Sequence, residues 1–484
     1  MDDQCCTEGT VCTVPDKSET MKFDLAVIGA GSAGFSAAIT AAGEGKQVAL
    51  IGYGTIGGTC VNVGCVPSKT MIRAAESLRQ SSVASRFSGI ESQARVADWS
   101  ALIAQKEQLV ADLRQAKYMD LLPVYNNIAY IEGRAALADG GVTVDGKRIK
   151  ADRVVIATGS SPSVPPIPGI DKVPYLTSTT ALQLQVQPKS LIVMGGGYIG
   201  CELAQMFARM GTRVTIVFRS RLLPEAEPEI SDALSDYFAD EGISIIGGLS
   251  YNSVSHSEDG IALVVQKDGQ DQTIVADHLL LTTGRHANTE GLELVPAGVA
   301  VLANGGIKVD DRMRTTKENI YAAGDVTGSD QFVYMAAYGA KIAAKNAING
   351  NTAIYDNRAM PAVVFTDPQV ASVGLTEAQA REIGIDVKIS LLPLKNVPRA
   401  LAARDTRGLI KLVADETTDK LIGAHILAPE GADSIQTAAI AIQQGMTVQE
   451  LGDMIFPYLT TVEGLKLAAQ TFDKDVKMLS CCAG

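Results

Sequence analysis

Histidine is scarce in this chain, and other features are missing altogether. Four of the 484 residues are histidine, His256, His278, His286 and His425, and they do not cluster. No apolar run approaches the roughly 18 residues that cross a membrane. The N-terminal stretch MDDQCCTEGTVC lacks the basic and apolar regions of a secretory signal, so we expect a cytoplasmic protein. A site built on clustered imidazoles is disfavoured.

An excess of basic charge is also absent. The net charge is −12, which argues against nucleic acid or an anionic membrane as the main partner. With 46% apolar and 20% charged residues, the composition is that of an ordinary soluble protein. A chain of 484 residues is too long for one core, and about three domains are expected.

Cysteines are present, and most of them lie in clusters. They are Cys5, Cys6, Cys12, Cys60, Cys65, Cys201, Cys481 and Cys482. In a reducing compartment such clusters more often indicate metal or redox chemistry than structural disulfides. The pair Cys5 and Cys6 fits capture of a soft metal and simple exposed thiols equally well. Cys201 lies within a predicted helix, where we expect it to pack as a small hydrophobic residue.

The central motif is GGTCVNVGCVPSK, residues 57–69. The loop between Cys60 and Cys65 is too short to gain much stability from disulfide closure, so chemistry is the better reason for the spacing. A helix predicted to begin at Pro67, together with Lys69, lowers the pKa of a nearby thiol. We therefore expect Cys65 to be the more acidic thiol. The alternative is two ordinary buried cysteines in a glycine-rich turn.

A nucleotide-binding pattern precedes this motif. The stretch FDLAVIGAGSAGFSAAITAAGEGKQVALIG predicts a strand, a turn, a helix and a second strand. Gly29, Gly31 and Gly34 have GxGxxG spacing in that context, which suits a turn that approaches a pyrophosphate. The acidic residue expected about 20 positions later, where it would hold a ribose, is missing. The second strand ends instead at Ile51-Gly52-Tyr53.

The same pattern occurs a second time, in SLIVMGGGYIGCELAQMFARMGTRVTIVFRS. Its glycines are Gly195, Gly197 and Gly200, so the chain is predicted to bind two dinucleotides. Arg219 and Arg221 follow the second strand of this copy and suit a 2′-phosphate, which favours NADPH over NADH. The alternative is a solvated strand end.

Further segments complete the predicted organisation. Helices are expected at about 68–84 and 98–118, and the stretch NIYAAGDVTG places Asp325 at a strand end, where it can accept hydrogen bonds from a sugar alcohol. The predicted domains are a tail (1–21), a first nucleotide domain in two parts (22–165 and 286–356), a second nucleotide domain (166–285) and a C-terminal domain (357–484).

Together, GAGSAG, GGTCVNVGCVPSK, ATG, GGGYIGCELA and AAGDVT resemble the pyridine nucleotide–disulfide oxidoreductases in order and spacing. The resemblance implies an α/β fold with two Rossmann-like domains, for FAD and NADPH, and a C-terminal α+β dimerisation domain. It implies a flavin-binding acid at Asp325, an ion pair of Lys69 with Glu202 beside the flavin, and Tyr198 over the nicotinamide pocket. Electrons would pass to Cys65, next to the flavin, and Cys60 would face the substrate. The implied FAD contacts are Gly29, Gly31, Gly34, Thr59, Lys69, Gly159 and Asp325, and the implied NADPH contacts are Gly195, Gly197, Gly200, Arg219 and Arg221.

The C-terminal part favours a metal substrate. Members that reduce a small disulfide carry a histidine that protonates the leaving thiolate. In FPYLTTVEGLKLAAQ, aligned through Glu463, that position is Tyr458, and a phenol with a pKa of about 10 is a poor proton donor at pH 7. The chain ends in the adjacent thiols Cys481 and Cys482, which suit a soft metal.

These features resemble the members of the family that reduce mercuric ion. The implied mechanism has Cys481 and Cys482 of a partner subunit capture Hg(II) and pass it to Cys60 and Cys65 in a homodimer. Tyr198 and Tyr458 would flank the metal, or they are plain packing aromatics. The rivals are a disulfide reductase of the lipoamide or glutathione type and a non-catalytic protein that sequesters soft metals.

Overall fold

The computed structural model describes residues 22–478. Within this range the chain divides into two units, and each is described by itself. Unit 1 contains residues 22–58, 114–160 and 286–355, and unit 2 contains residues 59–113, 161–285 and 356–478. This division into two units does not test the domain boundaries predicted from the sequence, and they remain predictions.

Unit 1 is built on a mainly parallel sheet in the order β3-β2-β1-β6-β5-β4, with β17 paired to β6. The hydrophobic runs of its central strands are buried on both faces, as parallel sheets require. The strands are β1 (Lys22–Ile28), β2 (Val48–Gly52), β3 (Ile128–Glu132), β4 (Ala135–Ala138), β5 (Gly141–Val144), β6 (Lys147–Ile156) and β17 (Ile320–Ala322).

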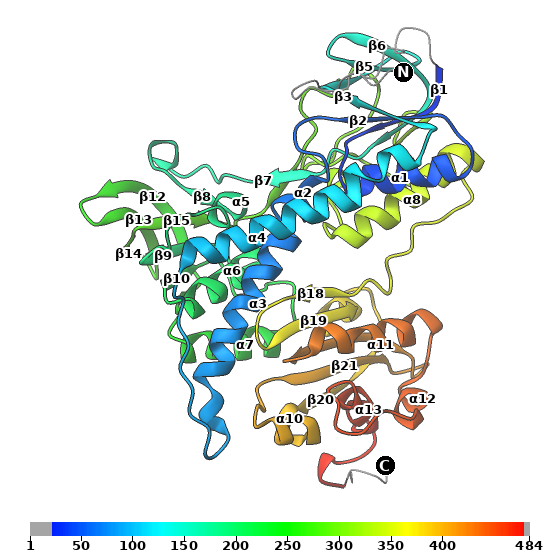
Figure 1. The fold of residues 1–484 in the computed structure, drawn as a ribbon. Helices are drawn as coiled ribbons and strands as arrows, with labels where there is room; N and C mark the ends of the chain where they lie inside the picture. Colours follow the sequence, from blue (N-terminus) through cyan, green and yellow to red (C-terminus); the bar gives the residue numbers. More distant parts are fainter. Residues whose placement is uncertain (1–21, 479–484) are drawn as a thin grey trace, which may run out of the picture. The chain divides into compact units, whose positions relative to one another are not determined.

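Two alanine-rich helices, α1 (Ser32–Gly43) and α8 (Val333–Asn349), pack against each other in unit 1 (Figure 1). Their small side chains form one core cluster with Leu25, Val27 and Leu50 of the sheet. Alanine and glycine at these positions let the two helices approach closely. The turn between β1 and α1 is thereby fixed at the carboxyl edge of the sheet.

Unit 2 contains a second parallel sheet, in the order β11-β10-β9-β15-β8. Its strands are β8 (Leu176–Thr177), β9 (Ser190–Met194), β10 (Arg213–Val217), β11 (Ser244–Ile246) and β15 (His278–Leu281). An antiparallel sheet of β12 (Ser250–Ser257), β13 (Gly260–Lys267) and β14 (Gln270–Ala276) is inserted before β15. The helices of this part are α5 (Ser178–Ala181), α6 (Tyr198–Arg209) and α7 (Pro228–Asp240).

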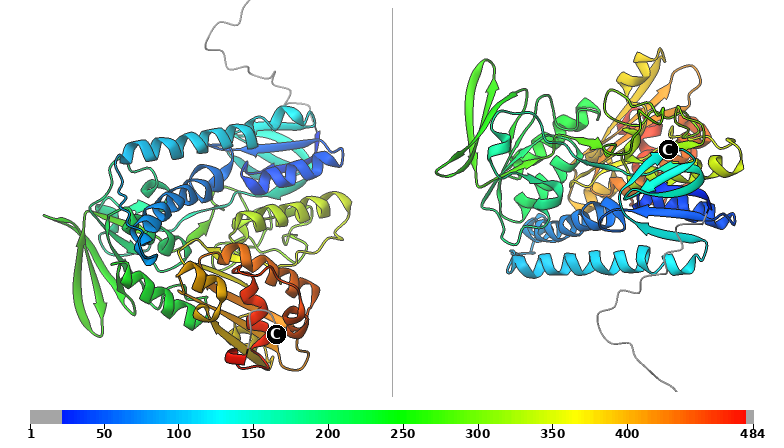
Figure 2. Two further views of the ribbon diagram at one scale, coloured as in Figure 1. Left: turned by 60° about the horizontal axis from the view of Figure 1, so that its bottom comes forward. Right: turned by 90° about the horizontal axis from the view of Figure 1, so that it is seen from above.

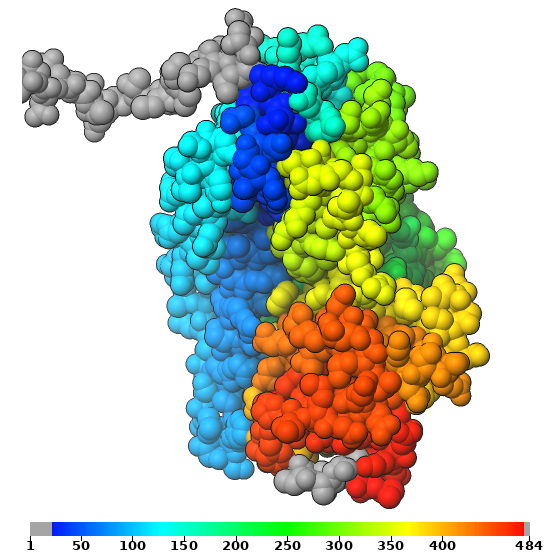
Figure 3. Space-filling view, turned by 90° about the vertical axis from the view of Figure 1, so that its right-hand side faces the viewer, coloured from blue at the N-terminus to red at the C-terminus, as the bar shows by residue number. Residues whose placement is uncertain are grey.

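The C-terminal part of unit 2 is an antiparallel sheet in the order β18-β19-β22-β21-β20, with α11 (Gly431–Gln444) packed on β19 and β22 (Figure 2). In the space-filling view its orange and red residues form one contiguous mass (Figure 3). The strands are β18 (Ala362–Val364), β19 (Gln369–Gly374), β20 (Val387–Pro393), β21 (Leu409–Asp415) and β22 (Leu421–Ala428). The other helices are α9 (Glu377–Glu382), α10 (Pro398–Ala403), α12 (Val448–Asp453) and α13 (Glu463–Gln470).

The cysteine motif lies on two helices, α2 (Gly58–Asn62) and α3 (Cys65–Ser82). Helix α3 begins two residues earlier than predicted, so Cys65 is its first residue and Pro67 its third. The first turn tolerates proline, because the N–H groups there have no partner within the helix. The helix predicted at 98–118 is α4 (Trp99–Arg114), followed by a π-helical turn over Gln115–Met119.

Two further short strands are β7 (Ser160–Pro162) and β16 (Arg285–Ala287). No helix among residues 22–478 is long and apolar enough to cross a membrane. Two parallel sheets with glycine-rich turns and a separate α+β part confirm the predicted fold class.

Candidate active site

The two cysteines of the central motif are brought together by backbone packing in unit 2. The N–H group of Val63 donates to the carbonyl of Thr59 at 2.9 Å, which closes the turn between α2 and α3. A Cβ atom added at Gly64 would lie 2.9 Å from the Thr59 oxygen and 3.3 Å from the Cα of Cys60. Only glycine permits this approach, and it carries Cys65 back towards Cys60.

Cys60 and Cys65 are free thiols, and both are half-buried. The hydrogen bond from Cys60 lowers the pKa of Cys65 to about 6, with a further contribution from the charge of Lys69. The same hydrogen bond, together with burial, raises the pKa of Cys60. Cys65 is the more acidic thiol, as expected, but its main stabiliser is Cys60 rather than Lys69. At pH 7 one sulfur is a thiolate and its neighbour holds a proton.

Lys69 lies one turn into α3, and its charge is held in place by Glu202 of α6. The Lys69 Nζ donates to the Glu202 Oε2 at 2.6 Å. The other carboxylate oxygen of Glu202 accepts the N–H group of Phe365 at 2.9 Å, and the Lys69 Nζ lies 4.9 Å from the centre of the Phe365 ring. The Glu202 side chain is only 6% exposed, so loss of Lys69 would leave a nearly buried carboxylate without its cation.

The glycine turn of unit 1 fits a dinucleotide. A Cβ atom at Gly29 would overlap the carbonyl oxygen of Ala157, and one at Gly34 would overlap the carbonyl oxygen of Gly29. The N-cap of α1 is Gly31, and no side chain caps the helix. A turn this tight, followed by an uncapped helix N-terminus, leaves backbone N–H groups for a pyrophosphate.

Asp325, Gly159 and Thr59 are the other predicted contacts of the first nucleotide. Asp325 begins a short 3₁₀ turn after β17 and accepts a hydrogen bond from the Ser160 hydroxyl at 2.6 Å. Gly159 follows β6 with a φ of +71°, in the left-handed region. Thr59 is exposed on α2 in unit 2. Asp325 and Gly159 both belong to unit 1, where the strands β6 and β17 are paired.

The second glycine turn, in unit 2, has the same form. A Cβ atom at Gly200 would overlap the Gly195 oxygen, and the N-cap of α6 is Gly197, again with no side-chain cap. Tyr198 is the first residue of α6, and burial together with the charge of Glu225 raises the pKa of its phenol.

The two arginines after β10 differ in their surroundings. Arg221 donates to the carbonyls of Pro224 at 2.9 Å and Ala226 at 2.6 Å, which fixes its guanidinium to its own loop. Arg219 is exposed at the end of the strand. Of the two residues that suit a 2′-phosphate, Arg219 is therefore the one oriented to solvent.

Tyr458 lies just before α13, and its side chain is 51% exposed. The next residue, Leu459, has a φ of +62°, and its N–H group donates to the Glu463 carboxylate at 3.2 Å. Glu463 thus holds the backbone of this loop. The thiols Cys481 and Cys482, like Cys5, Cys6 and Cys12, lie outside the described residues.

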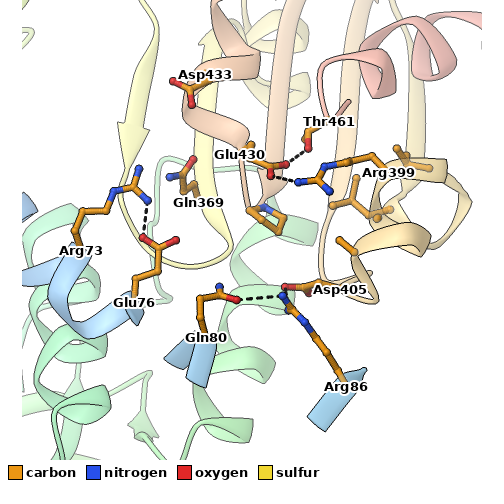
Figure 4. Close-up of a pocket in the computed structure, with 15 residues that line it drawn as sticks. Arg73, Glu76, Gln80, Arg86, Gln369, Arg399, Asp405, Glu430, Asp433 and Thr461 are labelled. Carbon is orange, nitrogen blue, oxygen red and sulfur yellow. Dashed lines mark hydrogen bonds and ion pairs between the residues drawn. The ribbon is translucent and has the colours of Figure 1, made fainter. Parts of the chain in front are cut away.

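A separate polar cavity of about 340 Å³ lies between α3 and the C-terminal part of unit 2 (Figure 4). Two ion pairs are formed by side chains that line it: Arg73 with Glu76 at 2.5 Å, and Arg399 with Glu430 at 2.8 Å. Glu430 also accepts a hydrogen bond from Thr461. None of the predicted site residues between 22 and 478 lines this cavity, so it is not the candidate active site.

Among residues 22–478, no histidine lies on the helices that carry Cys60, Cys65, Lys69 or Glu202. His425 is buried, its Nε2 lies 3.0 Å from the Leu375 oxygen, and burial lowers the pKa of its ring. No group of three or more histidine, cysteine or acidic residues that could hold a metal occurs within residues 22–478. Cys201 is completely buried, as expected of a packing residue.

Comparison with known proteins assigns these features to a family. A family model described as pyridine nucleotide-disulphide oxidoreductase matches residues 23–344, and a model of the dimerisation domain of the same family matches residues 360–469. The chain belongs to this family. It is therefore an oxidoreductase, and its C-terminal sheet, β18 to β22, is the family's dimerisation domain.

Two relatives are similar over almost the whole chain. A mercuric reductase of Staphylococcus aureus is 48% identical over 466 residues, which are 96% of this chain and 84% of that protein. A mercuric reductase of Streptomyces lividans is 47% identical over 471 residues, 96% of this chain and 98% of that protein. These relatives confirm the resemblance predicted from the sequence.

Two solved structures are similar to the whole fold. The Cu(II) complex of the flavoprotein disulfide reductase RclA from Escherichia coli has a TM-score of 0.81 and 33% identity, and covers 93% of this chain and 100% of its own. LpdA from Mycobacterium tuberculosis has a TM-score of 0.82 and 28% identity, with 94% and 100% covered.

Sequence reasoning missed Phe365. This residue contacts both members of the Lys69 and Glu202 pair, yet it lies in a different part of the chain from either of them. A phenylalanine two residues before an Asp-Pro step carries no signal of such a role. Only the packing of β18 against α6 brings it to the site.

Proposed function

We propose that this protein is an NADPH-dependent flavoenzyme that reduces Hg(II) to elemental mercury. The observation that carries the proposal is a dithiol, Cys60 and Cys65, with one acidic thiol and no histidine on α2, α3 or residues 456–470. The mercuric reductases that are 47–48% identical over most of the chain support the same substrate.

The dithiol suits a soft metal ion. Thiolates are the preferred ligands of such ions, and Cys65 is already a thiolate at pH 7. When Hg(II) binds both sulfurs, Cys60 releases its proton to solvent. Two electrons then convert Hg(II) to the neutral atom, both metal–sulfur bonds break, and both electron pairs stay with the sulfurs. FAD, when bound, carries the two electrons from NADPH to this centre, and NADP⁺ is the oxidised product.

Lys69 and Glu202 set the charge around the dithiol. Lys69 lowers the pKa of Cys65, and the negative charge of Glu202 raises it. The buried carboxylate thus limits how strongly the thiolate is stabilised and fixes the position of the ammonium group. A thiolate of moderate pKa can bind a metal ion and release it again.

The second glycine turn binds NADPH. Arg219, exposed after β10, pairs with the 2′-phosphate, and Gly195, Gly197 and Gly200 approach the pyrophosphate. Arg221 supports the loop through its bonds to two carbonyls. Tyr198, at the start of α6, covers the nicotinamide pocket.

Delivery of the metal uses the C-terminal pair and a second subunit. The matched dimerisation domain supports a homodimer, in which Cys481 and Cys482 of one tail serve the site of the partner subunit. The tail thiols capture thiol-bound Hg(II) and pass it by thiolate exchange to Cys60 and Cys65. Tyr198 and Tyr458 flank the metal during this transfer.

Disulfide reduction is the competing function, and RclA is described as a disulfide reductase. That reaction requires a proton for the leaving thiolate at neutral pH, and the aligned position here is Tyr458, whose ordinary pKa is about 10. The neighbouring acid, Glu463, is 6% exposed and bonded to the Leu459 N–H group, so it does not replace the missing donor.

The deciding experiment measures anaerobic NADPH oxidation with Hg(II)–thiol complexes, oxidised glutathione and oxidised lipoamide. Cu(II) is added as a competing metal, because RclA was solved as a Cu(II) complex. We expect rapid oxidation with Hg(II) and loss of volatile mercury from solution. Acceleration by a disulfide and not by Hg(II) would overturn the proposal.

The role of the tail is tested separately with the C481A/C482A variant. We expect it to lose turnover of thiol-bound Hg(II) while reduction of the flavin by NADPH is unchanged. The matched control is S480A, which changes the residue before the pair and leaves both thiols in place. Unchanged turnover in C481A/C482A would remove the tail from the mechanism.

A further inference from the structure

The first nucleotide turn lacks its usual ribose contact. In this type of fold an acidic residue at the end of the second strand accepts hydrogen bonds from the ribose hydroxyls. Here β2 ends at Gly52, which has no side chain. The next residue, Tyr53, is 66% exposed, and its hydroxyl accepts a hydrogen bond from Arg134 at 2.7 Å.

The space that a side chain at position 52 would use is already filled. A Cβ atom built on Gly52 would lie 2.5 Å from the hydroxyl oxygen of Tyr130 and 2.8 Å from the Cβ of Ala30. Tyr130 lies on β3 opposite Leu50, so its ring extends along the sheet to the end of β2. Ala30 is the residue between Gly29 and Gly31. The Tyr130 hydroxyl therefore stands at the glycine turn, where the missing acid would begin.

A carboxylate is present on the neighbouring strand. Glu132 is the last residue of β3 and the register partner of Gly52, so the two positions face the same side of the sheet. That side is also the side of α1, because Leu50 packs against Gly34. Glu132 is exposed, and its charge acts on Tyr130: burial, and then Glu132, raise the pKa of the phenol. Tyr130 therefore stays protonated and able to donate.

Both polar groups are available to a ligand. Within residues 22–478 neither the Tyr130 hydroxyl nor the Glu132 carboxylate has a hydrogen-bond or ion-pair partner in the protein. The half-buried hydroxyl and the exposed carboxylate thus lie together at the carboxyl edge of the sheet, beside the glycine turn, where a nucleotide ribose is bound in this fold.

We propose that Tyr130 and Glu132 hold the adenosine ribose of FAD from β3, in place of the acid that β2 lacks. Glu132 accepts a hydrogen bond from a ribose hydroxyl, and Tyr130 supplies a second polar contact while its ring fills the gap above Gly52. This assignment rests on FAD as the ligand of unit 1, which is part of the proposed function, but it does not depend on the substrate of the enzyme.

The first test titrates the apoprotein with FAD and with an FAD analogue whose adenosine ribose lacks the 2′-hydroxyl. Binding is followed by calorimetry and by flavin fluorescence. The unmodified protein should prefer FAD by about tenfold or more, as expected for a hydrogen bond to a charged group. Glu132→Gln, whose amide oxygen still accepts but carries no charge, should weaken FAD binding and reduce the preference, and Glu132→Ala should lose it. Tyr130→Phe, which keeps the ring, should have a smaller effect in the same direction.

The matched control is Glu44→Gln, which removes one exposed negative charge from the far end of α1, about 18 Å from its N-terminus. It should bind both flavins as the unmodified protein does. If Glu132→Gln keeps the full preference for FAD, the proposal is wrong. If the apoprotein binds no FAD at all, the flavoenzyme proposal itself fails, and the two outcomes are distinguishable.

The second test restores the acid. Gly52→Glu alone should weaken FAD binding, because its side chain meets Tyr130. Gly52→Glu combined with Tyr130→Ala and Ala30→Gly should bind FAD more tightly than Gly52→Glu alone, since both residues that meet the added Cβ atom are then cut back and the acid stands on β2. Circular dichroism confirms that each variant is folded. Unchanged or tighter FAD binding by Gly52→Glu alone would show that Tyr130 does not occupy the ribose position.

Discussion

The two glycine turns of this protein have almost the same backbone conformation. The helices and strand ends that follow the two turns carry different side chains. Gly29 and Gly195 have φ values of +116° and +115°, and the third glycine of each turn packs against the carbonyl oxygen of the first. The backbone that is expected to approach a pyrophosphate is therefore the same in both units. The residues placed to contact a ribose differ between the two copies.

The strand ends show the difference. Counting from the third glycine, Gly52 and Phe218 are equivalent positions, since each is 18 residues further on. In unit 1 the space above Gly52 is filled by Tyr130 from β3. In unit 2 Phe218 fills the corresponding space itself, above Gly196 and Gly247. An aromatic ring therefore fills the space at the end of the second strand in both units, but it comes from a neighbouring strand in unit 1 and from the residue after the strand itself in unit 2. The nearby charged residue is Glu132 in unit 1 and Arg219 in unit 2.

The helices after the turns differ as well. The second residue after the third glycine is Ser36 in α1 and Glu202 in α6. The Ser36 hydroxyl donates to the carbonyl of Ala337 in α8 at 2.7 Å, which is a packing contact. Glu202 holds Lys69 beside the dithiol. The same position thus serves structure in one unit and chemistry in the other.

The largest effects are expected from substitution of the third glycine of each turn. These substitutions test the close backbone approach that both turns have in common. Gly34→Ala and Gly200→Ala each force a methyl group into a backbone carbonyl oxygen, which cannot move far, at a cost of about 3 kcal/mol or more. Gly34→Ala should yield protein without flavin. Gly200→Ala should retain flavin and lose its reduction by NADPH, as followed by flavin absorbance under anaerobic conditions.

Gly197→Ala is the control for this pair, because nothing lies within 4 Å of its added Cβ atom. Its melting temperature should be unchanged, and only NADPH binding should weaken. Loss of flavin from Gly200→Ala would show that the two turns are not independent sites.

The sequence alone is sufficient to predict the features that depend on local spacing, which are the two glycine turns and the cysteine pair. Glycine spacing between a strand and a helix is a local pattern, and so is the pairing of Cys60 with Cys65, whose approach depends on Gly64 between them. The predicted start of α3 is two residues late, because proline is read as the first helical residue and here stands at the third.

The side chains that differ between the two units cannot be assigned from local sequence patterns. Tyr130 reaches Gly52 across 78 positions of sequence, and Glu132 faces it only through the register of β2 and β3. Two arginines after β10 are equivalent by spacing, yet Arg221 turns back to the carbonyls of its own loop. Such contacts depend on strand order and loop conformation, which residue spacing does not specify.

Arg219→Ala tests the cationic strand end of unit 2. Loss of an arginine–phosphate contact should raise the KM for NADPH by about 10- to 100-fold and leave the KM for NADH unchanged. Arg221→Ala is the matched variant: it should lower the free energy of unfolding by about 1 kcal/mol without changing the ratio of the two KM values. If Arg219→Ala left the ratio of the KM values for NADPH and NADH unchanged, Arg219 would not contact the 2′-phosphate, and the proposed difference between the two strand ends would be wrong.

Lys69→Met and Glu202→Gln test whether the ion pair between α3 and α6 controls the pKa of Cys65. Lys69 lowers this pKa, so its removal should raise it from about 6. The rise should stop short of the ordinary thiol value, because the hydrogen bond from Cys60 remains the larger contribution. Glu202 raises the pKa, so Glu202→Gln should lower it further. The pH dependence of Cys65 alkylation in the reduced protein gives the midpoints.

The two variants must shift the midpoint in opposite directions. At a pH between 6 and 8, Lys69→Met should therefore react more slowly than the unmodified protein and Glu202→Gln should react at least as fast. Shifts in the same direction would mean that loss of the ion pair moves α3, and the electrostatic account of Glu202 would then be replaced by a structural one.

The smallest expected effect is that of Ser36→Ala, the equivalent substitution in α1. It removes one half-buried hydrogen bond to Ala337 and should lower the free energy of unfolding by about 1 kcal/mol, measured by urea denaturation. Ser77→Ala is the control, because the Ser77 hydroxyl makes an exposed bond of the same length, 2.7 Å, to Ala74 within its own helix. Neither substitution should change the alkylation midpoint of Cys65. A shifted midpoint in Ser36→Ala would mean that α1 also acts on the dithiol, and that the division between a packing helix and a chemical helix is wrong.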